Sequence, residues 1–143
     1  MELIDNISRL LGDDLKRTTF RSGDCTLDNM LEECRTKFSD RNPLVRREAL
    51  ERLWDAWERL KSLADPRDKK QSIKIILDAV AAEPTLRSRL ETEAVELTAI
   101  GNSHLIRHSE VNQVAVIDVD HVDYLFHRLF AMIQLMLRKK GNA

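Results

Sequence analysis

The sequence predicts an all-α protein, a single-domain bundle of about five helices. Hydrophobic residues make up 43% and charged residues 33% of the 143 residues, with only 4 Gly and 3 Pro, which is the composition of a helical globular domain. Apolar residues recur at three- and four-residue spacings along most of the chain. A chain of this length can bury one real core but is short for two.

Charge and cysteine content exclude several classes of function. A net charge of -1 argues against coating nucleic acid or an anionic membrane by bulk electrostatics, although it leaves a local basic patch open. Cys25 and Cys34 have no second pair and no histidine near them, so we interpret them as reduced core residues of an intracellular protein. The sequence begins without the pattern of a signal peptide.

The most apolar stretch, Tyr124 to Leu137, does not read as a membrane span. Charged and polar residues interrupt it at His127, Arg128 and Gln134, and a span needs about 20 predominantly apolar residues. We therefore expect a cytoplasmic protein with no membrane partner.

Residues 1–41 form a helical leader or an extra hairpin ahead of the main bundle, which we place at residues 42–140. Apolar spacing predicts a short helix over Met1 to Leu11, stopped by Gly12. A second helix is predicted from about Thr26 to Ser39, with Thr26 as its N-cap.

The main bundle begins with a clear helix start, because Asn42 can cap and Pro43 suits the first helical position. Asp65 and Pro66 end this long helix. Its apolar face includes Trp54 and Trp57, which we interpret as core residues and not as a binding surface.

Two further helices are predicted between Asp68 and Gly101. The first runs from Asp68 to Ala82, and Pro84 lies in the first turn of the second. Gly101 is expected to end the second helix as a left-handed cap, and Asn102 to cap a short turn after it. The inward residues are expected to be Ile73, Ile76, Leu77 and Val80 in the first helix and Leu86, Leu90, Ala94, Leu97 and Ile100 in the second.

The last helix is the most apolar. Val111 to Asp118 reads as an extended connection, and Asp118 or Asp120 is expected to cap a helix that Gly141 ends. Its apolar residues cover more than one face, so it lies centrally in the bundle or is covered on one side by a partner chain.

Polar residues suited to chemistry gather in the segment GNSHLIRHSE, from Gly101 to Glu110. The four histidines of the chain all lie between His104 and His127. His104 and His108 are four residues apart and would share a helix face, but a lone HxxxH spacing is weak evidence for metal. A third ligand would have to come from Glu110 or His121, so we expect no metal and no cofactor.

Two other interpretations of this segment stay open. In metal-independent RNA cleavage, His108 would take the proton of a ribose 2′-hydroxyl, and Arg107 or Arg128 would hold the phosphate. Alternatively, His108, Glu110 and Arg107 only tie the segment to the last helix through hydrogen bonds and salt bridges.

The segments IGNSHLIRHSE, DVDHVDYLFHRLFAMIQLML and REALERLWDAWERLKSL together resemble the HEPN-like helical domains of bacterial abortive-infection proteins, the Abi group related to AbiJ. The resemblance covers about Asn42 to Lys140. It implies a small helical bundle, often a homodimer, in a superfamily with many ribonucleases of toxin and phage-defence systems.

The active motif of that family is an arginine, a polar residue and then a histidine. The matching positions here are Gly101, Asn102 and His108, so a glycine replaces the arginine. Either Arg107 supplies the cation from another backbone position, or the chain binds RNA or a partner without cleaving. Whether the chain is an enzyme stays open on the sequence.

The resemblance thus implies an HEPN-like module of a phage-defence or toxin-type system that binds or cleaves RNA without metal. His108, Arg107 and Asn102 would form its site, with Glu110 as orienting residue. The alternative is a non-catalytic dimerisation or sensor domain of a larger defence assembly. We expect a homodimer formed through the last helix or the helix of the two tryptophans. RNA is expected along a basic groove lined by Lys69, Lys70, Arg87 and Arg89.

Overall fold

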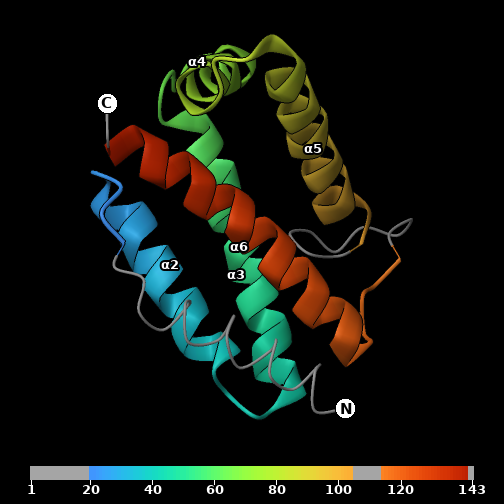
Figure 1. The fold of residues 1–143 in the computed structure, drawn as a ribbon. Coiled ribbons are helices and arrows are strands. Elements are labelled where there is room, and N and C mark those ends of the chain that lie inside the picture. The colour runs from blue at the N-terminus through green and yellow to red at the C-terminus, as the bar shows by residue number, and fades with distance from the viewer. Residues whose placement is uncertain (1–19, 105–113, 142–143) are drawn as a thin grey trace, which may run out of the picture.

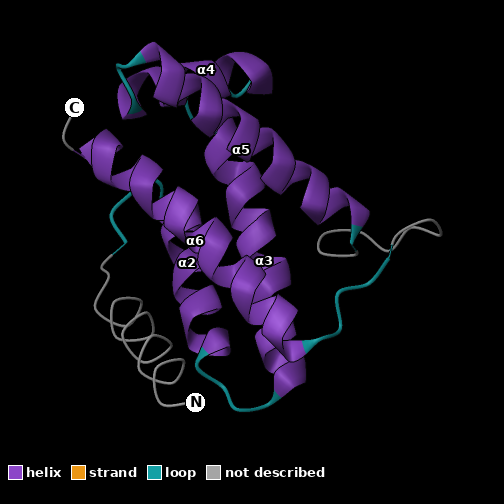
Figure 2. Cartoon of the chain, turned by 45° about the vertical axis from the view of Figure 1, so that its right-hand side comes forward, coloured by secondary structure: helices purple, strands orange, loops and turns teal. Residues whose placement is uncertain are grey.

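The computed structural model describes residues 20–104 and 114–141, and the regular structure in these ranges is entirely helical (Figure 2). Five helices are described: α2 (Cys25–Phe38), α3 (Pro43–Ser62), α4 (Lys69–Val80), α5 (Pro84–Ser103) and α6 (Val119–Gly141). The predicted all-α bundle of about five helices is therefore confirmed. The helix predicted over Met1 to Leu11 lies outside the described residues.

The helices α2 and α3 lie side by side, and α6 crosses α3 at the centre of the molecule (Figure 1). Helix α4 covers one end of the group formed by α2, α3 and α6. Helix α5 runs back from α4 on the side of α6 that is opposite α2 (Figure 1). The tryptophan indoles of α3 reach α5: Trp54 Nε1 donates to the carbonyl of Leu97 at 2.9 Å, and Trp57 Nε1 donates to Thr98 Oγ1 at 3.1 Å. Both tryptophans are fully buried, as predicted.

Aromatic contacts join the first described residues to the last helix. The ring of Phe38 stacks on Phe126 with centroids 3.8 Å apart, and Phe20 meets Phe130 edge to face at 6.1 Å. Helix α2 therefore shares one core with α3 and α6. This core is aliphatic with a few aromatic rings, and its largest fully buried side chains are Trp54, Trp57, Phe126, Leu27, Leu31, Leu50, Leu53, Leu60, Leu77, Leu97, Leu129 and Ile133.

The wide apolar surface of α6 is buried largely inside the monomer. Phe126, Leu129 and Ile133 are fully buried, and α6 packs against both α3 and α4. Of the two explanations that the sequence left open for this surface, the central position in the bundle accounts for these residues.

Helix starts follow local hydrogen bonding. Asn42 Oδ1 accepts from the amide of Leu44 at 3.0 Å, which confirms that cap. Asp118 caps α6, since its Oδ1 accepts from the amide of Asp120 at 2.8 Å. The prediction that Thr26 caps α2 was wrong. Asp24 does so, because its carboxylate accepts from the amide of Leu27 at 3.0 Å while it also holds Arg59.

The prediction of an inward stripe along all of α5 was wrong at Leu86, whereas Leu90 and Ile100 are partly buried against the core. Leu86 is 52% exposed, whereas the buried residues of α5 are Ala94, Leu97 and Gly101. The reason is that α5 meets the two tryptophans through its second half. Of the two cysteines, Cys34 is buried as expected and Cys25 is exposed.

Within the described residues, no helix is long and apolar enough to cross a membrane.

Candidate functional site

Gly101, where the resembling family carries an arginine, lies inside α5 and against Trp54. A Cβ at this position would lie 2.1 Å from Trp54 Nε1 and 2.2 Å from its Cδ1, much closer than carbon and nitrogen atoms pack. Tertiary packing therefore requires glycine here. The prediction that Gly101 ends the helix in a left-handed conformation was wrong, because α5 continues through it to Ser103, and among the described glycines only Gly23 has a positive φ.

Asn102 is an exposed residue of the last turn of α5. The prediction that it caps a separate turn was therefore wrong. It lies four residues after Thr98, so the two side chains share one face of the helix about 6 Å apart along its axis.

The end of α5 is joined to the segment before α6. The amide of Val114 donates to the carbonyl of Ser103 at 3.0 Å, and His104 Nδ1 lies 2.8 Å from the carbonyl oxygen of Val114. Because a carbonyl oxygen only accepts, Nδ1 carries the proton here. Further along, Arg47 Nε donates to the carbonyl of Val116 at 2.8 Å. His104 thus has a structural role at the end of α5.

Three of the four predicted catalytic residues, Arg107, His108 and Glu110, lie outside the described residues. The structure does describe both ends of their segment, which meet through Ser103 and Val114 beside the last turn of α5. Of the four predicted catalytic residues, Asn102 is therefore the one that the structure describes, and it is exposed at that end of the helix.

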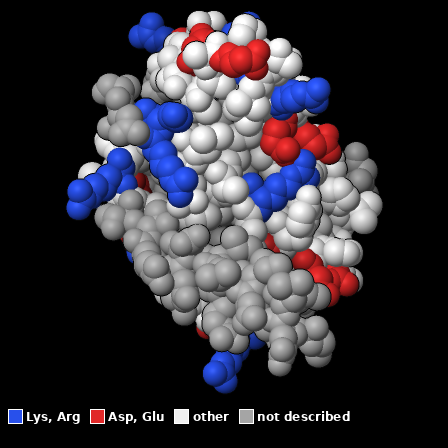
Figure 3. Space-filling model, in the orientation of Figure 1, with Lys and Arg blue, Asp and Glu red and all other residues white. Residues whose placement is uncertain are grey.

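A lysine-lined groove runs between α4 and α5, with a volume of about 500 Å³. Its rim and walls combine ammonium groups with an aliphatic surface, and its lining residues are Lys61, Lys69, Lys70, Ile73, Lys74, Glu91, Ala94, Val95 and Thr98. On the right-hand part of the face in Figure 3, acidic and basic side chains lie close together. The groove differs, because four lysines line it with one glutamate.

Lys61 lies at the base of this groove and is only 2% exposed. Its Nζ donates to Thr98 Oγ1 at 2.7 Å, forms an ion pair with Glu58, and lies 5.3 Å from the ring centroid of Trp57. Burial of an ammonium is costly unless such partners compensate. This network holds the second half of α5 against α3.

Glu58 holds two of the groove lysines. It pairs with Lys61 and, at 3.1 Å, with Lys69. Burial by itself raises the pKa of Glu58, but the hydrogen bonds and charges of Lys61 and Lys69 outweigh burial and hold that pKa below its ordinary value. Glu58 is therefore ionised at neutral pH and offsets part of the positive charge at the base of the groove.

The two remaining lysines, Lys70 and Lys74, are exposed one helical turn apart on α4. Within the described part of the chain neither forms an ion pair. They are the cations of the groove that an incoming anion can engage without breaking a salt bridge.

The four predicted RNA-binding residues separate into two groups. Lys69 and Lys70 line the groove. Arg87 is engaged by acids, with Nε 2.5 Å from Asp78 and Nη1 3.3 Å from Glu91. Arg89 is exposed and lies two residues from Glu91, so it points about 200° away from the groove side of α5.

The alternative phosphate clamp considered from the sequence, Arg128, is paired. Its Nε and Nη2 donate to the same oxygen of Glu93 at 2.9 and 2.5 Å. This ion pair links α6 to α5, which is a structural role.

A second polar cluster joins the starts of α3 and α6. Arg46 pairs with Asp123 at 2.5 Å and lies over the Phe38 ring, while the His127 ring meets Phe38 edge to face at 5.3 Å. Burial raises the pKa of Asp123, which Arg46 counteracts. Burial lowers the pKa of His127, because it disfavours the charged imidazolium, and the nearby negative charge of Asp123 opposes this effect. His127 is thus half-buried, whereas His121 is exposed.

Sequence reasoning missed Lys61, Lys74 and Thr98 of the groove. Lys61 had a recognisable signal, since it falls four residues after Trp57 on the apolar face of α3. Lys74 and Thr98 had none, because their proximity depends on how α4 and α5 pack. In residues 20–104 and 114–141, no group of three His, Cys, Asp or Glu side chains is placed to hold a metal ion.

No protein-family model matches the chain, and no curated protein and no solved structure shows significant similarity to it.

Proposed function

We propose that this chain is an HEPN-like helical module of a phage-defence or toxin-type system that acts in the cytoplasm by binding RNA. The observation that carries the proposal is the groove between α4 and α5, where Lys61, Lys69, Lys70 and Lys74 concentrate positive charge in a chain whose net charge is -1. Lysine side chains neutralise phosphates and bind them in any sequence.

The direction of the groove supports the proposal. Glu91, Val95 and Thr98 lie along one side of α5, and Asn102 continues this series by one more helical turn. A strand held in the groove would therefore lead toward the end of α5, where the segment with His108 begins.

Binding is better supported than cleavage. The indole of Trp54 fills the space that an arginine at position 101 would need, so a cleavage reaction here would depend on Arg107 with His108 as base. Metal-independent cleavage stays a prediction that the same experiment can decide.

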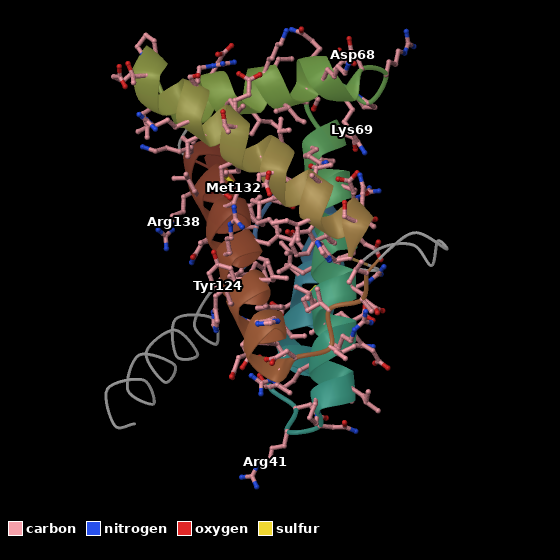
Figure 4. All side chains as sticks on the ribbon, turned by 90° about the vertical axis from the view of Figure 1, so that its right-hand side faces the viewer. Arg41, Asp68, Lys69, Tyr124, Met132 and Arg138 are labelled. Carbon is pink, nitrogen blue, oxygen red and sulfur yellow. The ribbon has the colours of Figure 1, made fainter. Side chains whose placement is uncertain are left out.

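The test measures binding of a labelled structured RNA by the parent and by Lys70→Glu, with chelator present. We expect the substitution to weaken binding about tenfold and to flatten the dependence of log K on log salt. Arg41→Glu is the matched control, because it makes the same charge change at the opposite end of the bundle from Lys69 (Figure 4). No binding by the parent, or equal loss in both variants, would contradict the proposal.

The same RNA, followed by gel, tests cleavage. Products from the parent but not from an equally folded His108→Ala variant would make the chain a ribonuclease. Intact RNA with both would make it a binding module.

A second candidate function, a dimerisation or sensor domain, is favoured by a separate observation. Leu44 is 72% exposed, Ile117 81% and Val119 39%, and the three line one small pocket between the starts of α3 and α6. Exposed apolar patches of this kind mark interaction sites.

Light scattering with size-exclusion chromatography tests the second candidate. If the patch mediates a homodimer, Leu44→Ser shifts the parent from dimer to monomer without lowering its melting temperature. A monomeric parent excludes self-association through this patch at the concentrations used.

A further inference from the structure

The groove between α4 and α5 has an aliphatic wall that phosphate binding alone does not require. Val95 is 66% exposed and lines the groove together with Ile73 and Ala94. An exposed valine beside lysines leaves apolar surface in water, which a ligand with an apolar face would cover. Inorganic phosphate and the regular outer surface of a duplex offer no such face.

The cations lie beside that wall. Lys70 and Lys74 are one turn apart on α4, with Cβ atoms about 5–6 Å from each other by helix geometry, so both ammonium groups can reach one phosphate. Ile73 lies between them in sequence and lines the same groove. Thr98 lies on the α5 side, where its hydroxyl already accepts from Lys61 and Trp57.

The size of the groove limits what it holds. Its volume of about 500 Å³ is within the usual range for small-molecule sites, about 300–1,000 Å³. A site of this volume can hold one nucleotide, whereas a double helix is too wide to enter it.

From these observations we propose that the groove binds a single unstacked nucleotide of a single-stranded RNA, with its base against Val95 and Ile73 and its phosphate on Lys70 and Lys74. This inference rests on the proposed function and deepens it by naming the form of RNA. Bases that are splayed out of a helix expose an apolar face, whereas A-form duplexes present phosphates and a shallow groove.

The experiment compares two probes by fluorescence anisotropy: a short single-stranded RNA and the same sequence as a blunt duplex. The variants are Val95→Ala, Lys70→Glu and, as control, Arg41→Glu. Val95→Ala removes apolar wall without removing charge, and alanine at an exposed helix position does not threaten folding. Thermal melts check that all variants are folded.

We expect the parent to bind the single strand about tenfold more tightly than the duplex. Val95→Ala should weaken single-strand binding about fivefold, through lost apolar contact, and leave duplex binding unchanged. Lys70→Glu should weaken both probes, and Arg41→Glu neither. In competition against the single strand, adenosine monophosphate should displace it at lower concentration than inorganic phosphate does.

Equal affinity for both probes, with Val95→Ala behaving as the parent, would overturn this inference. If Lys70→Glu still weakens binding in that case, the proposed RNA-binding function stands without the nucleotide pocket. No binding of either probe by the folded parent would overturn both.

Discussion

At the scale of single residues, the contact between Gly101 and Trp54 links fold to function most directly. The fully buried Trp54 indole reaches from α3 to the carbonyl of Leu97, and it occupies the space beside position 101. An arginine at this position would therefore require the tryptophan to move. The glycine follows from how α3 and α5 pack.

We expect Gly101→Arg to destabilise the fold by about 3 kcal/mol or more, because overpacking a core contact costs about 1–3 kcal/mol and a buried charge adds to that. Urea unfolding measures the change. Ala99→Arg is the control, since Ala99 is exposed two residues away on α5 and should change stability little. Equal stability of both variants would contradict the packing explanation.

A second prediction at this scale concerns His127. Burial lowers the pKa of His127 in the folded protein, whereas in the unfolded chain it keeps its ordinary value of about 6.5. At a pH between these two pKa values, His127 therefore binds a proton more readily in the unfolded chain than in the folded protein. Stability should therefore fall as pH decreases from about 7 through this window, and stop falling from this cause below the folded pKa.

Melting temperatures of the parent and His127→Gln between pH 7.5 and 5 test this. The melting temperature of His127→Gln should fall less with decreasing pH than that of the parent. His121→Gln changes an exposed position of the same helix, and its melting temperature should fall as much as that of the parent. An identical pH dependence in all three proteins would exclude His127 as a source.

At the scale of helices, the two N-caps of α2 and α3 differ in what they hold. Asn42 accepts one backbone amide at the start of α3. Asp24 accepts the amide of Leu27 and also pairs with Arg59, whose Nε lies 2.5 Å from Oδ2. The Asp24 cap thus fixes the start of α2 and also attaches α2 to α3.

We expect Asn42→Ala to cost about 1 kcal/mol, as removal of an N-cap usually does. Asp24→Ala should cost more than this, because it also removes the ion pair with Arg59. Chemical denaturation measures the loss caused by Asp24→Ala in the parent and again in the Arg59→Ala variant. The difference between the two losses separates the ion pair from the cap. Additive losses would show that the ion pair contributes nothing.

Helix identity followed from the sequence, and helix ends followed where a side chain could cap. The Asn42 and Pro43 start was predicted because both residues act within one turn. The Thr26 cap was predicted wrongly, because the carboxylate that caps α2 belongs to Asp24, which is also held by Arg59 on another helix. The end of α5 was misplaced for a similar reason, since the Trp54 contact with Gly101 is invisible in the sequence.

At the scale of the whole molecule, α5 buries few apolar side chains for its length. It buries Ala94, Leu97 and Gly101, whereas α3 buries eight residues over the same length of 20. Much of its attachment is polar, through Trp54, Trp57 and Lys61. Helices with few buried apolar contacts open at lower free energy than the core.

We therefore expect amide hydrogens in the first half of α5 to exchange with solvent earlier than those of α3, as measured by hydrogen–deuterium exchange with mass spectrometry. If the groove beside α5 binds RNA, single-stranded RNA should slow exchange in α4 and α5 and leave α2 unchanged. Uniform exchange across all helices would contradict this order of stability.

The sequence by itself determined the all-α class, the central burial of Trp54 and Trp57, and the start of α3, because apolar periodicity and capping act over a few neighbouring residues. It also indicated Lys69 and Lys70 as residues of a basic groove. Only the tertiary structure decided that Lys61 and Lys74 join them, that Glu93 pairs with Arg128, and that position 101 must be glycine. These features depend on how α3, α4, α5 and α6 pack, and contacts between residues far apart in the chain leave no periodic signal within any one helix.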